Sequence, residues 1–302
     1  MPELPEVETV RRALDATIRG RTIARVWLSG LSLREPVAET VPACLAGRRV
    51  VALRRIGKYL LIDCDGEVTM LSHLGMSGRW LFFATPPDDA PMSHVHARLT
   101  FSDGAAAWYQ DARRFGLLRV VATARLAHDP SLAALGPDPV TDVLDPTALR
   151  QAARASRTPI KSFLLDQSRI AGIGNIYASE ILHRAKIDPR RLAGIVSAAQ
   201  WARIVDETST VLGEAIDGMG TTFSMYRTVW GEEGQYGERL RVYGREGDPC
   251  ATCGRGIRRL VQSGRATYFC TRCQPAGRPP ARPPAREPAR PAVRAVAARR
   301  HL

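Results

Sequence analysis

The chain has 302 residues, of which 45% are hydrophobic and 24% charged. This is a soluble globular composition that excludes a largely disordered chain and leaves room for two domains. The formal net charge of +13 predicts a polyanionic partner, because basic side chains neutralise phosphates and release counterions. A basic ribosomal or membrane-surface protein would share this charge. Residues 1–20 lack the apolar core of a signal peptide, and no run approaches the roughly 18 apolar residues of a membrane span, so we expect a cytoplasmic protein.

The first stretch that suggests a catalytic function is M-P-E-L-P-E-V-E, residues 1–8. Removal of Met1 would give Pro2 a free secondary amine, which titrates near pH ~8 and is therefore partly nucleophilic at physiological pH. Glu3 would lie beside this amine to exchange protons. Apolar residues at helical spacing predict a packed helix from Pro5 to about Gly20 that anchors the amine. The alternative is an ordinary N-terminus in which two prolines set the start of a helix.

Residues 22–121 are expected to form strands, which suggests an antiparallel sandwich or barrel that carries the N-terminal helix. Asp-Gly pairs at 65–66 and 103–104 separate apolar runs and predict hairpins. Residues 85–91 are expected to be a loop. The expected strands are T-I-A-R-V-W-L, V-V-A-L-R-R-I-G-K-Y-L-L-I-D, V-T-M-L-S-H-L, A-R-L-T-F and A-A-A-W-Y.

Proline and aspartate punctuate residues 126–150, which predicts a connector with a domain boundary near 135–150. Three helices are expected after it: I-K-S-F-L-L-D, N-I-Y-A-S-E-I-L-H-R-A, and residues 197–217, which open with an S-x-x-Q capping box. The intervening G-I-G-N could present backbone N–H groups to a phosphate, although a plain turn is the alternative. Residues 223–238 are glycine-rich and are expected to form a mobile loop.

Four of the six cysteines form two C-x-x-C pairs, Cys250 with Cys253 and Cys270 with Cys273. In a cytoplasmic protein such pairs favour a metal over disulfides. Their spacing fits a tetrahedral four-thiolate zinc site on a β-hairpin. Four protein ligands leave no open position for water, so the zinc would be structural. Two redox or accidental pairs are the alternative.

The last 28 residues, 275–302, contain proline repeats and seven arginines against Glu287, a net +6. Too few large apolar residues are present to offset the entropy of ordering, so this tail is expected to be disordered or extended. Its charge predicts that it holds the protein near its polyanionic partner by counterion release alone. A functionless extension is the alternative.

P-E-L-P-E-V-E at the N-terminus resembles the formamidopyrimidine-DNA glycosylase family, which excises oxidised purines. The likeness covers residues 1 to about 274. It continues in G-K-Y-L-L with Lys58, H-L-G-M-S-G, R-R-F-G, G-I-G-N-I-Y-A-S-E, V-Y-G-R and the cysteine pairs.

The resemblance implies an α+β multidomain protein. It comprises an N-terminal catalytic β-sandwich with an N-terminal helix (1–135), a linker (136–150), a helix-two-turns-helix DNA-binding domain (151–235) and a zinc-finger hairpin (236–274). The basic tail (275–302) lies beyond the residues that the resemblance covers.

The resemblance also implies the chemistry. The Pro2 nitrogen attacks C1′ of the damaged nucleoside and forms a Schiff base, and β,δ-elimination then cuts the strand on both sides of the sugar. Glu3 would act as an acid in ring opening, and Glu6 would help to position the turn. Lys58 would lie at the phosphate or the leaving base; a strand-end charge is the alternative for this lysine.

Such an enzyme extrudes the damaged nucleotide from the duplex and must fill the hole. The resemblance gives this role to Met76, Arg113 and Phe115, each of which could otherwise be a core residue or a surface charge. Ala112 stands where the family often has proline, so a looser presentation of Arg113 is expected. The further DNA contacts that the resemblance implies are His94, Lys161, Asn175 and Arg265; for Arg265 an exposed turn arginine is the alternative.

The sequence therefore predicts a bifunctional DNA glycosylase and AP lyase that removes 8-oxoguanine and formamidopyrimidines from damaged double-stranded DNA. We expect a bacterial, nucleoid-associated monomer with one structural zinc ion. One rival is an endonuclease VIII-like enzyme for oxidised pyrimidines, against which P-E-L-P-E-V-E rather than P-E-G-P-E argues. The other is a zinc-dependent nucleic-acid-binding protein without catalysis.

Overall fold

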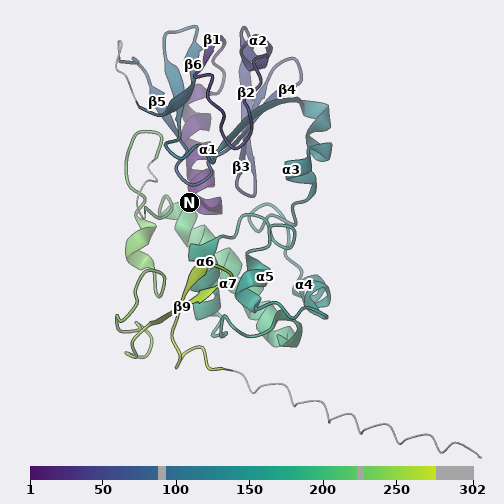
Figure 1. Cartoon of the computed structure of the whole chain (residues 1–302), viewed down its shortest axis with the longest axis vertical. Coiled ribbons are helices and arrows are strands. Elements are labelled where there is room, and N and C mark those ends of the chain that lie inside the picture. The colour runs from purple at the N-terminus through teal and green to yellow at the C-terminus, as the bar shows by residue number, and fades with distance from the viewer. Residues whose placement is uncertain (88–92, 223–227, 277–302) are drawn as a thin grey trace, which may run out of the picture.

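A computed structural model describes residues 1–87, 93–222 and 228–276. A part that contains β1 to β8 and helix α1 lies above a mainly helical part, and the N-terminus lies at the level where the two meet (Figure 1). Most of the predicted 85–91 loop, the first residues of the predicted 223–238 loop and nearly all of the predicted tail lie outside the described residues.

Two antiparallel sheets of four strands each form the N-terminal domain, with strand orders β1-β6-β7-β5 and β2-β3-β4-β8. The strands are β1 (Ile23–Leu28), β2 (Val50–Ile56), β3 (Tyr59–Cys64), β4 (Val68–His73), β5 (Arg79–Phe83), β6 (Val95–Phe101), β7 (Ala106–Gln110) and β8 (Leu117–Ala122). The predicted sandwich and both Asp-Gly hairpins are confirmed. Strands β5 and β8, and the short helix α2 (Val41–Leu45), are additional to the predicted elements.

One predicted strand is wrong. V-V-A-L-R-R-I-G-K-Y-L-L-I-D was expected to be continuous, but β2 and β3 are two strands of a hairpin in which Ile56 pairs with Tyr59. Gly57 has a φ of +57°, a conformation that glycine adopts without steric cost. This turn places Lys58 at the end of the sandwich that faces the helical part.

Helix α1 (Leu4–Ile18) packs on the sandwich. Its Val7, Val10, Leu14 and Ile18 side chains are buried in the same core as residues of both sheets. Each such side chain contributes about 1.5–3 kcal/mol when it leaves water. The helix is therefore fixed to the sandwich along its length, and its first residues project toward the second domain.

The helical domain contains α4 (Pro146–Ala153), α5 (Ile160–Leu164), α6 (Asn175–Arg184) and α7 (Ala198–Asp217), with η2 (Ala193–Ile195) and η3 (Tyr236–Arg239). The three predicted helices are confirmed, and so is the capping box: Ser197 Oγ accepts from Gln200 N at 3.3 Å, and Gln200 Oε1 accepts from Ser197 N at 2.9 Å. Trp201 is completely buried and packs edge-on against Phe163 of α5.

The predicted connector is partly helical, because it contains α3 (Pro130–Ala133) and α4 and follows η1 (Thr123–His128). Both α-helices open with Asp-Pro. Asp129 accepts from the Ser131 N–H at 2.9 Å, and Asp145 accepts from the Thr147 N–H at 2.8 Å. An Asp-Pro pair can mark a loop, but it can also begin a helix with aspartate as N-cap and proline as the first helical residue. Here it begins α3 and α4.

Strands β9 (Arg258–Gln262) and β10 (Arg265–Phe269) form the predicted C-terminal hairpin. It lies beside α6 (Figure 1), and Gln274 Nε2 donates to Ile187 O, just beyond that helix, at 2.8 Å. Within the described residues, no helix is both long and apolar enough to cross a membrane.

Candidate active site

The N-terminus is buried where the two domains meet. Pro2 is buried, whereas Met1 before it is 49% exposed. The carboxylate of Glu3 accepts from two backbone N–H groups in the first turn of α6, at 2.9 Å from Ile176 and 3.3 Å from Tyr177. Unpaired N–H groups and the helix dipole make this helix end favourable for an anion. An acid beside the N-terminal nitrogen is thus held in place by the other domain.

Two glycines make this approach possible. A Cβ at Gly174 would lie 2.1 Å from the carboxyl carbon of Glu3, and a Cβ at Gly172 would lie 2.4 Å from Leu4 Cδ1. Leu4 N also donates to Gly172 O at 3.1 Å. The G-I-G-N segment was predicted as a turn that approaches phosphate. In this structure it admits the N-terminal residues of the chain, a contact that the sequence does not reveal.

Glu6 lies one turn after Glu3, and its Oε2 accepts from the Glu3 N–H at 2.7 Å. Its Oε1 accepts from Thr221 N at 2.8 Å and from the Tyr177 hydroxyl at 2.5 Å. Burial and the charge of Glu3 raise the pKa of Glu6 to about 6. Burial also raises the pKa of Glu3, against the opposing charge of Lys58. A raised pKa makes it easier for a carboxyl to hold a proton that it can then deliver as a general acid.

Lys58 supplies a positive charge close to Glu3 and Glu6. It is 7% exposed, and its Nζ donates to Ile173 O of the G-I-G-N segment at 2.9 Å. Burial lowers the pKa of Lys58, while the charge of Glu3 opposes the shift. The turn that carries Lys58 is fixed by Asp138, which accepts from Gly57 N at 2.7 Å and also pairs with buried Arg55. Glu3, Glu6 and Lys58 of the first domain therefore meet the G-I-G-N segment and the start of α6 in the second domain.

The three residues predicted to fill the DNA void lie together on two adjacent loops. Met76 and Phe115 are apolar yet 39% and 46% exposed, so they are available to a partner. The Arg113 guanidinium lies 4.8 Å from the centroid of the Phe115 ring. Gly75 has a φ of +61°, and a Cβ there would lie 2.4 Å from the carbonyl carbon of Phe115, so the two loops touch backbone to backbone.

Asp111 holds this pair of loops together, and the sequence did not single it out. It is completely buried and accepts from Ser77 Oγ at 2.5 Å, Gly116 N at 2.8 Å and Arg113 N at 3.3 Å. An aspartate that binds the N–H two residues later is a common turn device, which is the signal that could have identified it. Because these bonds fix the Arg113 backbone, the looser presentation expected from Ala112 does not follow.

The remaining predicted DNA contacts lie in different surroundings. Arg265 is exposed at the start of β10, and His94 is exposed with a φ of +67°. Asn175 Nδ2 donates to Ala266 O at 3.0 Å. Lys161 is 1% exposed, and its Nζ donates to Ala266 O at 2.8 Å and to Thr267 Oγ1 at 2.9 Å. Lys161 thus supports the strand that begins with Arg265, and burial lowers its pKa to about 7.

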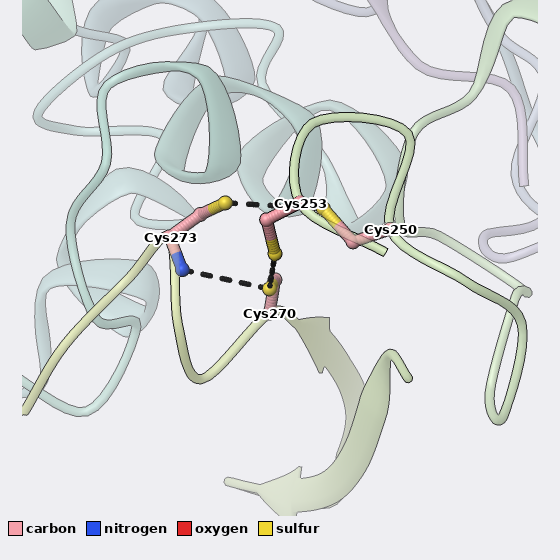
Figure 2. Close-up of side chains that lie close together, drawn as sticks. All are labelled: Cys250, Cys253, Cys270 and Cys273. Atoms are coloured by element: carbon pink, nitrogen blue, oxygen red, sulfur yellow. Dashed lines mark hydrogen bonds between the residues drawn. The ribbon is translucent and has the colours of Figure 1, made fainter. Parts of the chain in front are cut away.

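The four predicted zinc ligands lie together (Figure 2). Their sulfur atoms are all within 4.8 Å of one another. The Sγ–Sγ distances are 3.9 Å for Cys250 and Cys273 and 3.5 Å for Cys253 and Cys270. Zn–S bonds of about 2.3 Å in a tetrahedron place sulfurs about 3.8 Å apart, so these four thiols fit a zinc ion and leave no catalytic position.

Glu180 of α6 connects the helical domain to the segment that leads to the cysteines. Its completely buried carboxylate accepts from the N–H groups of Arg241, Val242 and Tyr243 at 2.8, 2.9 and 2.8 Å. Burial raises the pKa of Glu180, and these three backbone donors oppose the shift. Glu180 lies in the G-I-G-N-I-Y-A-S-E segment, and two of its three donors lie in the V-Y-G-R segment. Both segments carry the family resemblance, but neither predicts that they contact each other.

Comparison with known proteins agrees with this arrangement. The formamidopyrimidine-DNA glycosylase N-terminal domain matches residues 1–118, the H2TH domain of the same family matches residues 135–226, and the zinc finger found in FPG and IleRS matches residues 247–276. A formamidopyrimidine-DNA glycosylase of Acidiphilium cryptum is 46% identical over 279 residues, which cover 91% of this chain and 100% of that protein.

Two solved structures extend the comparison to three dimensions. The MutM (Fpg) protein of Thermus thermophilus is 37% identical with a TM-score of 0.82. A Lactococcus lactis FPG variant in complex with DNA containing Fapy-dG is 32% identical with a TM-score of 0.84. Each comparison covers 91% of this chain and 100% of the other. With its sandwich, its helical domain and its cysteine cluster all matched, the chain belongs to the formamidopyrimidine-DNA glycosylase family.

Proposed function

We propose that this protein excises oxidised purines, 8-oxoguanine and formamidopyrimidines, from double-stranded DNA and then cuts the strand at the resulting abasic site. The observation that carries this proposal is the buried N-terminus beside Glu3, because a reactive amine needs an acid fixed at hydrogen-bonding range of the sugar. The relatives share this architecture, and one of them binds DNA that contains Fapy-dG.

The reaction begins once Met1 is removed, since only then is the Pro2 nitrogen a free amine. The nitrogen attacks C1′, the glycosidic bond breaks, and the bonding electron pair leaves with the base. Opening of the sugar ring gives a Schiff base between Pro2 and C1′, with a proton delivered from Glu3 to the ring oxygen. Successive β- and δ-elimination then release the phosphates on both sides of the sugar. Glu6 positions the Glu3 backbone, and Lys58 lies toward the phosphate or the leaving base.

The DNA must be kinked and its damaged nucleotide extruded for C1′ to reach Pro2. Met76 and Phe115 would enter the vacated stack, and Arg113 would donate to the orphaned base. We assign phosphate contacts to the side chains of His94, Asn175 and Arg265, whereas buried Lys161 would act on DNA binding by supporting the strand that begins with Arg265. The zinc ion, bound by the four cysteines, would hold the hairpin that presents Arg265 and take no part in the chemistry.

We further propose that the protein acts as a monomer associated with the bacterial nucleoid in the cytoplasm. Its chain would divide into a catalytic sandwich (1–135), a linker (136–150), the helix-two-turns-helix domain (151–235), the zinc finger (236–274) and a basic tail (275–302).

Borohydride reduction of the Schiff base tests the proposal. With an 8-oxoguanine duplex, peptide mapping should find the DNA adduct on Pro2 and intact mass should show that Met1 is absent; an undamaged duplex should give no adduct. An adduct on Lys58, or active protein that retains Met1, would overturn the mechanism. Faster trapping with an oxidised-pyrimidine duplex would favour the endonuclease VIII-like alternative.

A further inference from the structure

A buried histidine lies against the cysteine cluster. His183 is in the last turn of α6 and is 3% exposed. Its Nε2 lies 3.5 Å from the Sγ of Cys250, a hydrogen-bonding distance for sulfur. Its other ring nitrogen, Nδ1, has no hydrogen-bond partner among the described residues. Neither the proposed chemistry nor the DNA contacts use this side chain.

The two nitrogens differ in what a proton on each would do. A proton on Nδ1 would be a buried donor without an acceptor, and the Nε2 lone pair would then face a sulfur that is a thiolate when zinc is bound. Both arrangements are unfavourable, since an unsatisfied buried donor alone costs about 1–3 kcal/mol. A proton on Nε2 instead forms a charge-assisted N–H···S bond and leaves only an acceptor without a partner.

His183 is not placed as a ligand. In the described part of the chain, the cluster of potential metal-binding atoms that all lie within 4.8 Å of one another contains the four cysteine sulfurs and no histidine nitrogen. The imidazole therefore contacts Cys250 without belonging to the set of four ligands, so it can orient that ligand without coordinating zinc.

The position of His183 on α6 shows what this contact joins. Glu180, one helical turn earlier, binds the backbone N–H groups of residues 241–243, and His183 reaches Cys250 a few residues later. Residues at i and i+3 share one face of a helix. The segment that enters the zinc site is thus fastened at both ends to one face of α6.

We propose that His183 is a positioning residue that donates its Nε2–H to the zinc-bound thiolate of Cys250, slowing loss of zinc and fixing the finger to α6. Donation of a hydrogen bond lowers the negative charge on the sulfur, which stabilises the thiolate and makes it less reactive toward competing electrophiles. Such outer contacts typically change metal affinity by about 10- to 100-fold. The proposal rests on the zinc site of the proposed function, and its test reads zinc retention rather than catalysis.

Two substitutions separate the hydrogen bond from the space that the ring fills. In His183→Gln the side-chain amide nitrogen can take the place of Nε2, whereas in His183→Asn it takes the place of Nδ1 and points away from the sulfur. Transfer of zinc from the purified full-length holoprotein to a chromogenic chelator is measured for both. We expect roughly 10- to 100-fold faster release from His183→Asn and release within about threefold of wild type from His183→Gln. His128→Gln, at an exposed position outside the helical domain, is the control and should not differ from wild type.

Equal release from all variants would refute the proposal, and so would equally fast release from the Gln and Asn variants, because the ring volume alone would then matter. The wild-type protein gives a measurement that needs no variant. In protein substituted with ¹¹³Cd, ¹⁵N NMR should show His183 protonated at Nε2 and coupled to the metal through the hydrogen bond to sulfur. Protonation at Nδ1, or a direct nitrogen–metal bond, would overturn the assignment. Failure of borohydride trapping at Pro2 would leave these results unchanged and would count only against the catalytic proposal.

Discussion

Glu3 and Glu6 are two acids buried one helical turn apart, and backbone N–H groups bind both of them. Each additional negative charge in this space is unfavourable, so one carboxyl is expected to keep its proton to a higher pH than it would in water. The pair resembles other catalytic sites in which neighbouring carboxyls titrate apart.

The raised pKa of Glu6 predicts a pH dependence of stability. The folded state binds the Glu6 proton more tightly than the unfolded state does. The stabilisation is therefore complete below pH ~4.5 and is lost as pH rises through about 6. A shift from 4.5 to about 6 corresponds to about 2 kcal/mol. The difference in free energy of unfolding between wild type and Glu6→Gln, measured by urea denaturation, should change by up to this amount between pH 4.5 and 7. Parallel curves for the two proteins would contradict it.

Gly174→Ala should separate catalysis from folding. The new Cβ would lie 2.1 Å from the Glu3 carboxyl carbon, so it should displace this carboxylate from the start of α6. Single-turnover strand cleavage, which follows ring opening by Glu3, should fall by about 100-fold, the size of effect that general acid–base catalysis typically contributes. Zinc content and affinity for undamaged DNA should change little.

Gly213→Ala is the matched control for this substitution. Gly213 lies within α7, and a Cβ there meets no atom within 4 Å. It should raise stability by up to about 1 kcal/mol, because alanine has the higher helix propensity. Strand cleavage should stay at the wild-type rate; a comparable loss in both variants would mean that Gly174 acts through stability alone.

The geometry of the two loops that carry Met76 and Phe115 depends on Asp111. Asp111→Asn replaces one acceptor oxygen with an NH₂ group that must face Ser77 or a backbone N–H, so a buried donor is left without a partner at a cost of about 1–3 kcal/mol. Insertion of Met76 and Phe115 into the duplex should be slower. The fluorescence of 2-aminopurine placed opposite the lesion measures this rate.

Asp103→Asn is the appropriate comparison, since Asp103 also accepts from the N–H two residues later, at 3.2 Å from Ala105, but in an exposed hairpin. It should leave insertion unchanged. Equal rates of insertion for the Asp111 and Asp103 variants would show that the loops hold their geometry without the buried carboxylate.

The elements that follow local rules could be predicted from the sequence. Helical spacing identified α6 and α7, and the cysteine spacing identified the hairpin and its ligands. The errors arise where one signal has two outcomes. Asp-Pro begins α3 and α4 but also marks loops, and Gly57 interrupts an apolar run that is otherwise typical of one strand.

The site residues divide in a similar way. Glu3 and the residues proposed to fill the void lie in short segments that carry the family resemblance, so they could be named. Asp111, Glu180 and His183 act on partners that are close only in the folded chain. Asp111 reaches back to Ser77, Glu180 binds backbone about 60 positions away, and His183 meets a cysteine 67 positions away. A single sequence carries no signal for such contacts.

Each of the two large domains contributes a residue to the hydrophobic core of the other. Leu4, at the start of α1, is completely buried in the helical domain with residues of α6 and α7. Val229, which follows α7 in the helical domain, is buried with residues of the sandwich, and Phe82 N donates to its carbonyl at 3.0 Å. The two halves are therefore joined by reciprocal packing as well as by the chain.

The basic tail gives a prediction for the complete protein. Seven arginines less Glu287 supply +6 of the net +13. If three or four of these arginines contact phosphates, ending the chain at Gln274 should flatten the dependence of log K on log salt by roughly 3 units, at about 0.9 per contact. Single-turnover excision should be unchanged. A full-length chain with all seven arginines replaced by glutamine should match the truncated one, and an unaltered salt slope in either would reject the electrostatic role.

The binding of the Glu3 carboxylate to the first turn of α6 also limits which domains of its relatives this protein can accept by recombination. The acid comes from one domain, and the helix end and glycines that hold it come from the other. A chimaera that joins the sandwich of one relative to the helical domain of another would keep both cores but would form a working site only if the junction residues match. Selection therefore acts on the two halves as one heritable unit. Because α6 also holds the segment that leads into the finger, recombination within the gene is expected to be tolerated mainly in the tail.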